Sequence, residues 1–221
     1  MQLDTDFMIE HIPDFVLAAG LTLRIGIIAI VLSLALSILY SGILYFRVPV
    51  LKTFVRAHVE VARNTPLLIQ LFFLYYGLPS LGIKLPGLTV AFIAMAFLGG
   101  GYFTEVFRSG LEAVDKNQEE SGLAIGLSRW QLFRHIVLPQ ALRIALPSLF
   151  ANFIFLLKET TIVSAIAVPE LLFTTTSYIS LYYKTYEMLL MMTFCYLLIF
   201  LPLSFGLSWI ERRYRHGAYG N

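Results

Sequence analysis

Two opposite charges stand side by side in an otherwise apolar stretch of this sequence. Lys158 and Glu159 interrupt the run from Pro147 to Val168. A charge at membrane depth costs at least a few kcal/mol unless it is paired or hydrated. Neighbouring residues on a helix point about 100° apart, so these two side chains need partners other than each other. A polar cavity would supply them, with Lys158 attracting a carboxylate and Glu159 an ammonium group, as suits a zwitterion. Inter-helix salt bridges are the alternative.

The depth of this pair depends on where its helix begins. Pro147 lacks an N–H and suits a first helical turn, so we expect the helix to start there. Lys158 would then lie about 16 Å along the helix, near the middle of a bilayer. A helix continuous from Pro139 would instead place Lys158 about 28 Å along, close to the outer edge.

Four further polar side chains are predicted to line the same path. Thr160 and Asn152 belong to the same stretch, and Gln70 to an earlier apolar run. Arg24 lies about 13 Å into the first apolar run if that run begins at Phe15. Each residue has an alternative role: the hydroxyl and amide groups could join helices, and the long Arg24 side chain could extend back to the head groups.

Residues that commonly perform catalysis do not form a recognisable pattern here. The histidines at 11, 58, 135 and 216 are scattered, and Cys195 is the single cysteine. The sequence has neither the H-E-x-x-H nor the G-x-S-x-G pattern, and it lacks the G-x-x-x-x-G-K-[ST] phosphate loop. We therefore expect no enzyme activity, no metal site and no cofactor in this chain. Any ATP chemistry would belong to another polypeptide.

Segment 117–138 combines signals for two short helices joined by a turn. Asn117 can cap the first helix, and Glu119 and Glu120 lie in its first turn, where carboxylates meet unpaired N–H groups. Gly126 suits the left-handed position that follows a helix. These local signals predict a compact helical hairpin.

The second helix of this hairpin has its own start and stop signals. Ser128 and Gln131 have the spacing of a capping box, and Pro139 is predicted to end the helix. An apolar face would result, and such a face needs a partner. Its members are Leu123, Leu127, Trp130 and Phe133.

The whole chain is predicted to be one membrane domain, 1–221. It is 58% hydrophobic and 14% charged, with a mean hydropathy of +0.76, which is too apolar for a soluble domain. The net charge of +2 is too small to indicate a nucleic-acid partner. The triplet 99–101 (GGG) favours close helix packing. Five membrane crossings are predicted, near 15–46, 52–83, 86–112, 147–168 and 185–212.

Basic residues predict the orientation of these crossings. They concentrate between the apolar runs 15–46 and 66–83, between the runs 86–107 and 147–168, and in the tail, whereas the opposite side has only Lys84 and Lys184. Because cytoplasmic loops are enriched in Lys and Arg, we expect the N-terminus outside and the C-terminus in the cytoplasm.

The hairpin resembles the signature of permease subunits of ATP-binding-cassette (ABC) importers. That signature reads E-A-A-x-x-x-G, then nine residues, then I-x-L-P. The chain meets it with the full spacing at Glu120, Gly126, Ile136, Leu138 and Pro139. Ser121 and Gly122 replace the two alanines; both are small, although Gly122 weakens a helix by about 1 kcal/mol. Segments 63–68 (RNTPLL), 138–141 (LPQA), 157–160 (LKET) and 168–171 (VPEL) resemble the polar amino acid branch of this family.

The resemblance implies an all-α integral membrane protein with the type I ABC importer permease fold. It implies translocation of an amino acid across the bacterial cytoplasmic membrane. The implied partners are an ABC ATPase subunit in two copies that carry ATP and Mg, a second permease, and an extracytoplasmic solute-binding protein. The hairpin would be the coupling loop that docks into the ATPase, through Glu119, Glu120, Ser121, Gly122, Gly126, Leu127 and Trp130.

Other functions make different demands on the sequence. A secondary transporter or channel would need an ion site or gate but no docking hairpin, and no inverted repeat is visible. An intramembrane enzyme would need a catalytic cluster. The hairpin could also merely join two crossings. Which amino acid is carried, the number of substrate sites, and whether the permease pairs with itself or with a relative stay open.

Overall fold

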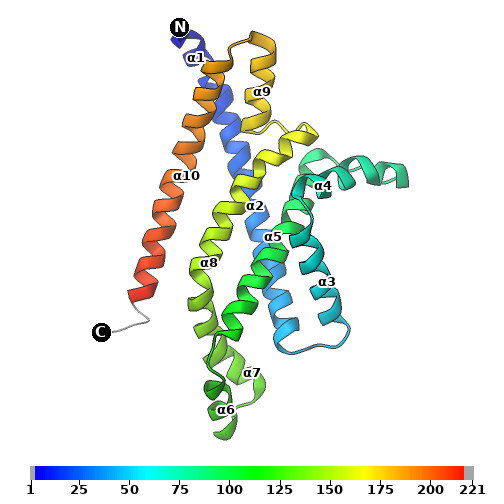
Figure 1. Ribbon diagram of the computed structural model, residues 1–221, viewed down its shortest axis with the longest axis vertical. Coiled ribbons are helices and arrows are strands. Elements are labelled where there is room, and N and C mark those ends of the chain that lie inside the picture. The colour runs from blue at the N-terminus through cyan, green and yellow to red at the C-terminus, as the bar shows by residue number, and fades with distance from the viewer. Residues whose placement is uncertain (1–2, 217–221) are drawn as a thin grey trace.

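Every regular element of this chain in residues 3–216, the part that the computed structural model describes, is helical. Four helices there are long and apolar enough to cross a membrane. They are Ile12–Tyr45 (α2), Gly87–Glu112 (α5), the continuous stretch Arg129–Ile166, and Thr185–Arg213 within α10 (Thr185–His216). Figure 1 shows α2, α5 and the central part of the third stretch crossing one another in a bundle, with α10 at its margin. The predicted all-helical membrane fold is confirmed.

The second predicted crossing, 52–83, is broken. Its first part is α3 (Leu51–Asn64), and its second part comprises α4 (Leu67–Phe72), the π-helical η1 (Phe73–Gly77) and the 3₁₀-helical η2 (Leu78–Leu81). Pro66 is extended at the break, with φ −60° and ψ 141°. Its ring removes one helical hydrogen bond and disfavours helix in the preceding residue. The second part therefore leaves the bundle sideways (Figure 1).

The fourth predicted crossing does not begin at Pro147. Pro147 lies inside α8 (Leu138–Lys158), which continues from α7 (Arg129–Leu132) and the π-helical η3 (Phe133–Val137). The predictions that Pro147 starts this helix and that Pro139 ends the preceding one are both wrong.

Local geometry and packing explain why the helix continues through both prolines. The wider π turn of η3 stands directly before Pro139 and accommodates a residue without an N–H. At Pro147 the neighbouring helix α5 supports α8, because a Cβ added to Gly110 would lie only 2.7 Å from the carbonyl oxygen of Ala141. Close backbone packing of this kind stabilises α8 despite one missing hydrogen bond.

Two helices appear that the sequence did not predict. The short α1 (Thr5–Glu10) precedes α2, and α9 (Leu171–Tyr182) occupies most of the loop expected from Pro169 to Lys184. The carboxylate of Glu170 caps α9 by accepting the Phe173 N–H at 2.8 Å. The Leu171 N–H donates to Thr22 Oγ1 of α2 at 3.1 Å, which fixes α9 against the bundle.

Candidate functional site

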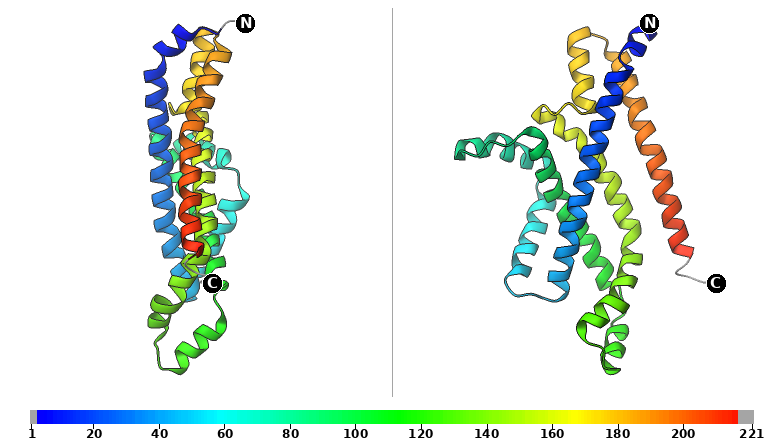
Figure 2. Two further views of the ribbon diagram at one scale, coloured as in Figure 1. Left: turned by 90° about the vertical axis from the view of Figure 1, so that its left-hand side faces the viewer. Right: turned by 180° about the vertical axis from the view of Figure 1, so that it is seen from behind.

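The predicted coupling loop lies at one extreme of the long axis. It consists of α6 (Lys116–Ala124), α7 and η3, beyond the adjoining ends of α5 and α8 and far from the N-terminus (Figure 1). Both views in Figure 2 place it at the same end. The loop is therefore positioned where a separate subunit could reach it without entering the bundle.

The predicted cap of the first loop helix was two residues late. Asp115 is the cap, and its Oδ1 accepts the backbone N–H of Asn117 at 2.9 Å. Both residue types can cap a helix, and the carboxylate also favours the positive helix end. Asn117 therefore lies inside α6.

The turn and the second cap have the predicted geometry. Gly126 has φ +86°, the left-handed conformation that glycine adopts easily. Ser128 Oγ accepts the Gln131 N–H at 3.3 Å, and the Ser128 N–H donates to Gln131 Oε1 at 2.9 Å. The capping box is thus confirmed in both directions.

Close packing makes the two loop helices one unit. Gly122 of α6 is buried against α7, and a Cβ there would lie 2.5 Å from Leu132 Cδ1. Leu132 joins a small core with Val137 and with Val114, which follows α5. The loop therefore packs directly against the ends of α5 and α8.

The predicted coupling residues divide into an exposed and an inward set. Glu120, Ser121, Gly126 and Trp130 are exposed, whereas Glu119 and Leu127 are half-buried and Gly122 is buried. Phe133 was expected on the apolar outer face, but it is only 8% exposed and packs inward. Ile125 at the turn was missed although its side chain is 78% exposed. The sequence signal that could have identified Ile125 was a large apolar residue beside the turn glycine Gly126.

The charged pair lies where the helix changes its winding. Lys158 is the last residue of α8, and Glu159 is the first residue of a 3₁₀ segment, η4 (Glu159–Ile166). A Cβ added to Gly26 would overlap the side chain of Leu157, so this junction is level with the middle of the 34-residue α2. A 3₁₀ stretch within a longer helix often marks a functional hinge.

Neither charge of the pair meets an opposite charge among the side chains that the structure describes. The ion pairs found among residues 3–213 do not include Lys158 or Glu159. Lys158 Nζ lies 6.0 Å from the ring centroid of Phe200 on α10, within range of a cation–π interaction. The Glu159 side chain is half-buried. The inter-helix salt bridges considered as an alternative thus find no partners in the described part of this chain.

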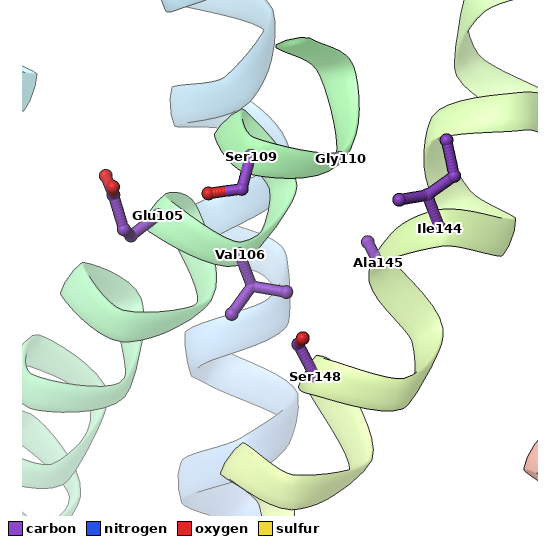
Figure 3. Close-up of a pocket in the computed structure, with 7 residues that line it drawn as sticks. All are labelled: Glu105, Val106, Ser109, Gly110, Ile144, Ala145 and Ser148. Carbon is purple, nitrogen blue, oxygen red and sulfur yellow. The ribbon is translucent and has the colours of Figure 1, made fainter. Parts of the chain in front are cut away.

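A polar stripe extends from Glu159 along α8. Asn152 stands seven residues before Glu159 and Ser148 one further turn away, so the three share one helix face. Ser148 also lines an open recess between α5 and α8, with a volume of about 180 Å³. Glu105 and Ser109 of α5 are among its lining residues. Figure 3 shows Val106 of α5 directed across this recess towards α8.

The remaining predicted path residues are not gathered around Glu159. Thr160 is fully buried against α2, and its hydroxyl donates to the Leu157 carbonyl oxygen at 2.7 Å. Gln70 Nε2 donates to the carbonyl oxygens of Ala62 and Thr65 beside the Pro66 break, both at 3.2 Å. Arg24 is exposed on α2, about 160° around the helix from the Gly26 contact with α8.

Comparisons with known proteins identify the family. Residues 34–216 match the family described as "Binding-protein-dependent transport system inner membrane component". The chain is 36% identical over 172 residues to the "Probable amino-acid permease protein YxeN" of Bacillus subtilis, covering 76% of this chain and 77% of the relative. It is 31% identical over 215 residues to the "Glutamine transport system permease protein GlnP" of Escherichia coli K12, covering 96% and 98%.

A solved structure with the same architecture agrees with this assignment. The chain superposes with a TM-score of 0.89 and 30% identity on the "Crystal structure of an amino acid ABC transporter with histidines", covering 96% of this chain and 100% of that one. That similarity extends over both the bundle and the coupling loop. The chain therefore belongs to the inner-membrane permease components of binding-protein-dependent ABC transport systems.

Proposed function

We propose that this chain is the permease of an ATP-driven importer that carries an amino acid across the bacterial cytoplasmic membrane. The observation that carries the proposal is the closely packed loop with an exposed acidic and apolar surface at one end of the bundle, with Glu120 and Gly126 at their signature positions. The relatives named for amino acids or glutamine supply the substrate class.

The proposed complex contains three kinds of partner. Two ATPase subunits bind ATP and Mg, and each receives a coupling loop. The exposed Glu120, Ser121, Gly126 and Trp130 would contact the ATPase, and Glu119, Gly122 and Leu127 would shape the loop from within. A second permease, identical or related, completes the translocation path. An extracytoplasmic solute-binding protein delivers the amino acid near α9. Closure of the ATPases moves the loops, and the path opens alternately to each side.

The proposed orientation has the N-terminus outside and the C-terminus in the cytoplasm. The α2–α3 connection, which contains Arg47, lies towards the same end as the coupling loop, whereas Lys184 lies with α1 at the other end (Figure 1). This distribution is the one expected from the positive-inside tendency.

Cysteine labelling tests the proposed orientation. Glu10→Cys and Gln118→Cys are each introduced singly in a Cys195→Ala background, and an impermeant thiol reagent added outside should label only the cysteine at position 10.

Lys158 and Glu159 are proposed to bind the two charged ends of the amino acid. The cost of unpaired charge beside the middle of α2 supports this role. Asn152 and Ser148 continue the path towards the recess between α5 and α8. Thr160 and Gln70 would shape the path by fixing its backbone. Arg24, on the face of α2 turned away from α8, is left out of this path.

Reconstitution tests the proposed function. The permease with its ATPase and binding protein, in proteoliposomes, is assayed for uptake of L-glutamine, L-histidine, L-arginine and L-glutamate. Uptake of at least one should require ATP, and Lys158→Met and Glu159→Gln should each reduce it at least about tenfold, which corresponds to about 1.4 kcal/mol. Lys84→Met and Glu10→Gln, at exposed positions, are matched controls. Uptake driven by an ion gradient without ATP would contradict the proposal.

A further inference from the structure

Two aromatic residues at the end of α2 reach the coupling loop. Tyr45 is the last residue of α2, and Phe46 caps the helix. The Tyr45 ring centroid lies 4.5 Å from that of Phe133 in η3. The Phe46 ring lies 5.3 Å from Phe133 and 6.0 Å from Trp130 of α7. Aromatic rings attract one another at such separations. We call these four residues the aromatic clasp.

A hydrogen bond extends the aromatic clasp to the other loop helix. The Tyr45 hydroxyl donates to Glu119 Oε1 at 3.3 Å, across 74 residues of sequence. Glu119 therefore faces α2, although it lies in the segment that was predicted to face the ATPase. The end of α2 is thus attached to α6, α7 and η3 by side chains.

Backbone hydrogen bonds just after the end of α2 fix the positions of Tyr45 and Phe46. The Arg47 N–H donates to the Leu44 carbonyl oxygen at 3.2 Å, and the Val48 N–H to that of Ile43 at 3.1 Å. This pair of bonds ends a helix tightly and requires a left-handed residue, which here is Arg47 with φ +53°. Non-glycine residues in this conformation are uncommon and occur where the surroundings enforce them.

The connection to the loop differs between α2 and its neighbours. α5 and α8 lead directly into the loop along the chain, so any loop movement reaches them through the backbone. α2 has no such covalent route, because α3, α4 and α5 intervene. Yet α2 packs against α8 beside Lys158, where Gly26 meets Leu157. A link from the loop to α2 would therefore also reach the charged pair.

We propose that Tyr45 and Phe46 are positioning residues for energy coupling, which transmit loop movement to α2 through the aromatic clasp. The inference rests on the proposed function. When the ATPases displace the loop, the clasp moves the end of α2 with it, and α2 shifts in step with α5 and α8. Without the clasp, α5 and α8 would move while α2 lagged behind, so ATP would be hydrolysed without completing the transport path.

The test compares two rates in the full reconstituted complex. The amino acid used is the one from the above panel that the wild-type complex transports. For each complex, the rate of its uptake is divided by the rate of ATP hydrolysis. Phe46→Ala should lower this ratio at least about fivefold while ATP hydrolysis stays within twofold of wild type. Phe46→Leu, which retains an apolar contact, should give a ratio between those of the wild type and of Phe46→Ala. Phe205→Ala, at a ring on α10 that is 68% exposed, is the matched control and should leave the ratio unchanged.

Each possible outcome either supports or overturns the proposed role of the aromatic clasp. An unchanged ratio in assembled Phe46→Ala complexes overturns the inference. If Phe46→Ala fails to assemble, the ratio in Phe46→Leu decides in the same way, since a reduced value supports coupling and a wild-type value overturns it. A wild-type complex that takes up no amino acid of the panel fails the proposed function itself, a result distinct from wild-type transport with unaffected variants.

Discussion

Gly99 of α5 lies directly against Ser33 of α2: a Cβ added to Gly99 would stand 2.9 Å from the Cβ of Ser33. A Cβ cannot move away by rotation of a side chain, so Gly99→Ala must push the two helices apart. Overpacking of this kind costs about 1–3 kcal/mol. We expect a clear fall in the thermal unfolding temperature of the protein in detergent.

Gly20→Ala provides the matched control for this seam. Gly20 belongs to α2, but no atom lies within 4 Å of an added Cβ. The substitution should be neutral or stabilising by up to about 1 kcal/mol, because alanine favours helix. Similar unfolding temperatures for the two variants would show that the seam between α2 and α5 tolerates an extra methyl group.

Arg47→Gly should stabilise the end of α2. Arg47 has φ +53°, which costs an L-residue about 1–2 kcal/mol, whereas glycine adopts it freely. Glycine loses more chain entropy on folding, which offsets about 0.5–1 kcal/mol of that gain. The free energy of unfolding of Arg47→Gly, measured by denaturation, should be slightly higher than that of the parent protein. Arg56→Gly, inside α3, should instead destabilise by about 1 kcal/mol, and the opposite order of the two variants would exclude strain at Arg47.

Gln70→Leu should destabilise the broken second segment. The Gln70 amide donates to the carbonyl oxygens of Ala62 and Thr65, which lack helical partners because Pro66 interrupts the helix. Buried acceptors left unpaired cost about 1–3 kcal/mol. Thermal unfolding should detect this loss, while Gln118→Leu at an exposed site on α6 should have little effect. Equal effects of the two substitutions would refute the structural role of Gln70.

Acid should loosen α1. The hydrogen bond from Lys184 lowers the pKa of Asp4 below its ordinary value of 3.8, with a further contribution from the Phe7 N–H. Asp4 lies outside the spans. A lowered carboxyl pKa stabilises the folded state above the ordinary pKa, and this contribution disappears as the pH falls through the folded-state pKa. Hydrogen exchange of the α1 amides should therefore show reduced protection below about pH 4.

Asp4→Ala isolates the titration of this carboxyl group. The variant lacks both the cap and the ion pair, so its α1 amides should be less protected at neutral pH and lose little more in acid. Because the pair is exposed, high salt should weaken it in the parent protein. Equal acid sensitivity of parent and variant would assign the effect to another group.

The coupling loop could be predicted in detail because its signals are local. Gly126 and the Ser128–Gln131 capping box depend on residues within three positions of one another, and the structure has both. The first cap fell on Asp115 rather than Asn117 because both residues are suitable and only the fold decides between them.

Features that depend on tertiary packing could not be read from the sequence. A proline ends one helix at Pro66, yet Pro147 lies inside another, because close packing of α5 supports α8 beside it. The inward orientation of Glu119 and Phe133 depends on Tyr45, far away in the sequence. The polar path residues were chosen by type, whereas their directions depend on helix phase, which places Arg24 away from Glu159.

The tight winding that begins at Glu159 has a mechanical consequence. A 3₁₀ helix rises about 2.0 Å per residue and an α-helix about 1.5 Å. Rewinding the eight residues of η4 as α-helix would therefore shorten that segment by about 4 Å. The residues beyond Glu159 would also rotate relative to Lys158. Without any hinge between rigid bodies, one local change of pitch would therefore shift α9, which follows η4, relative to the charged pair.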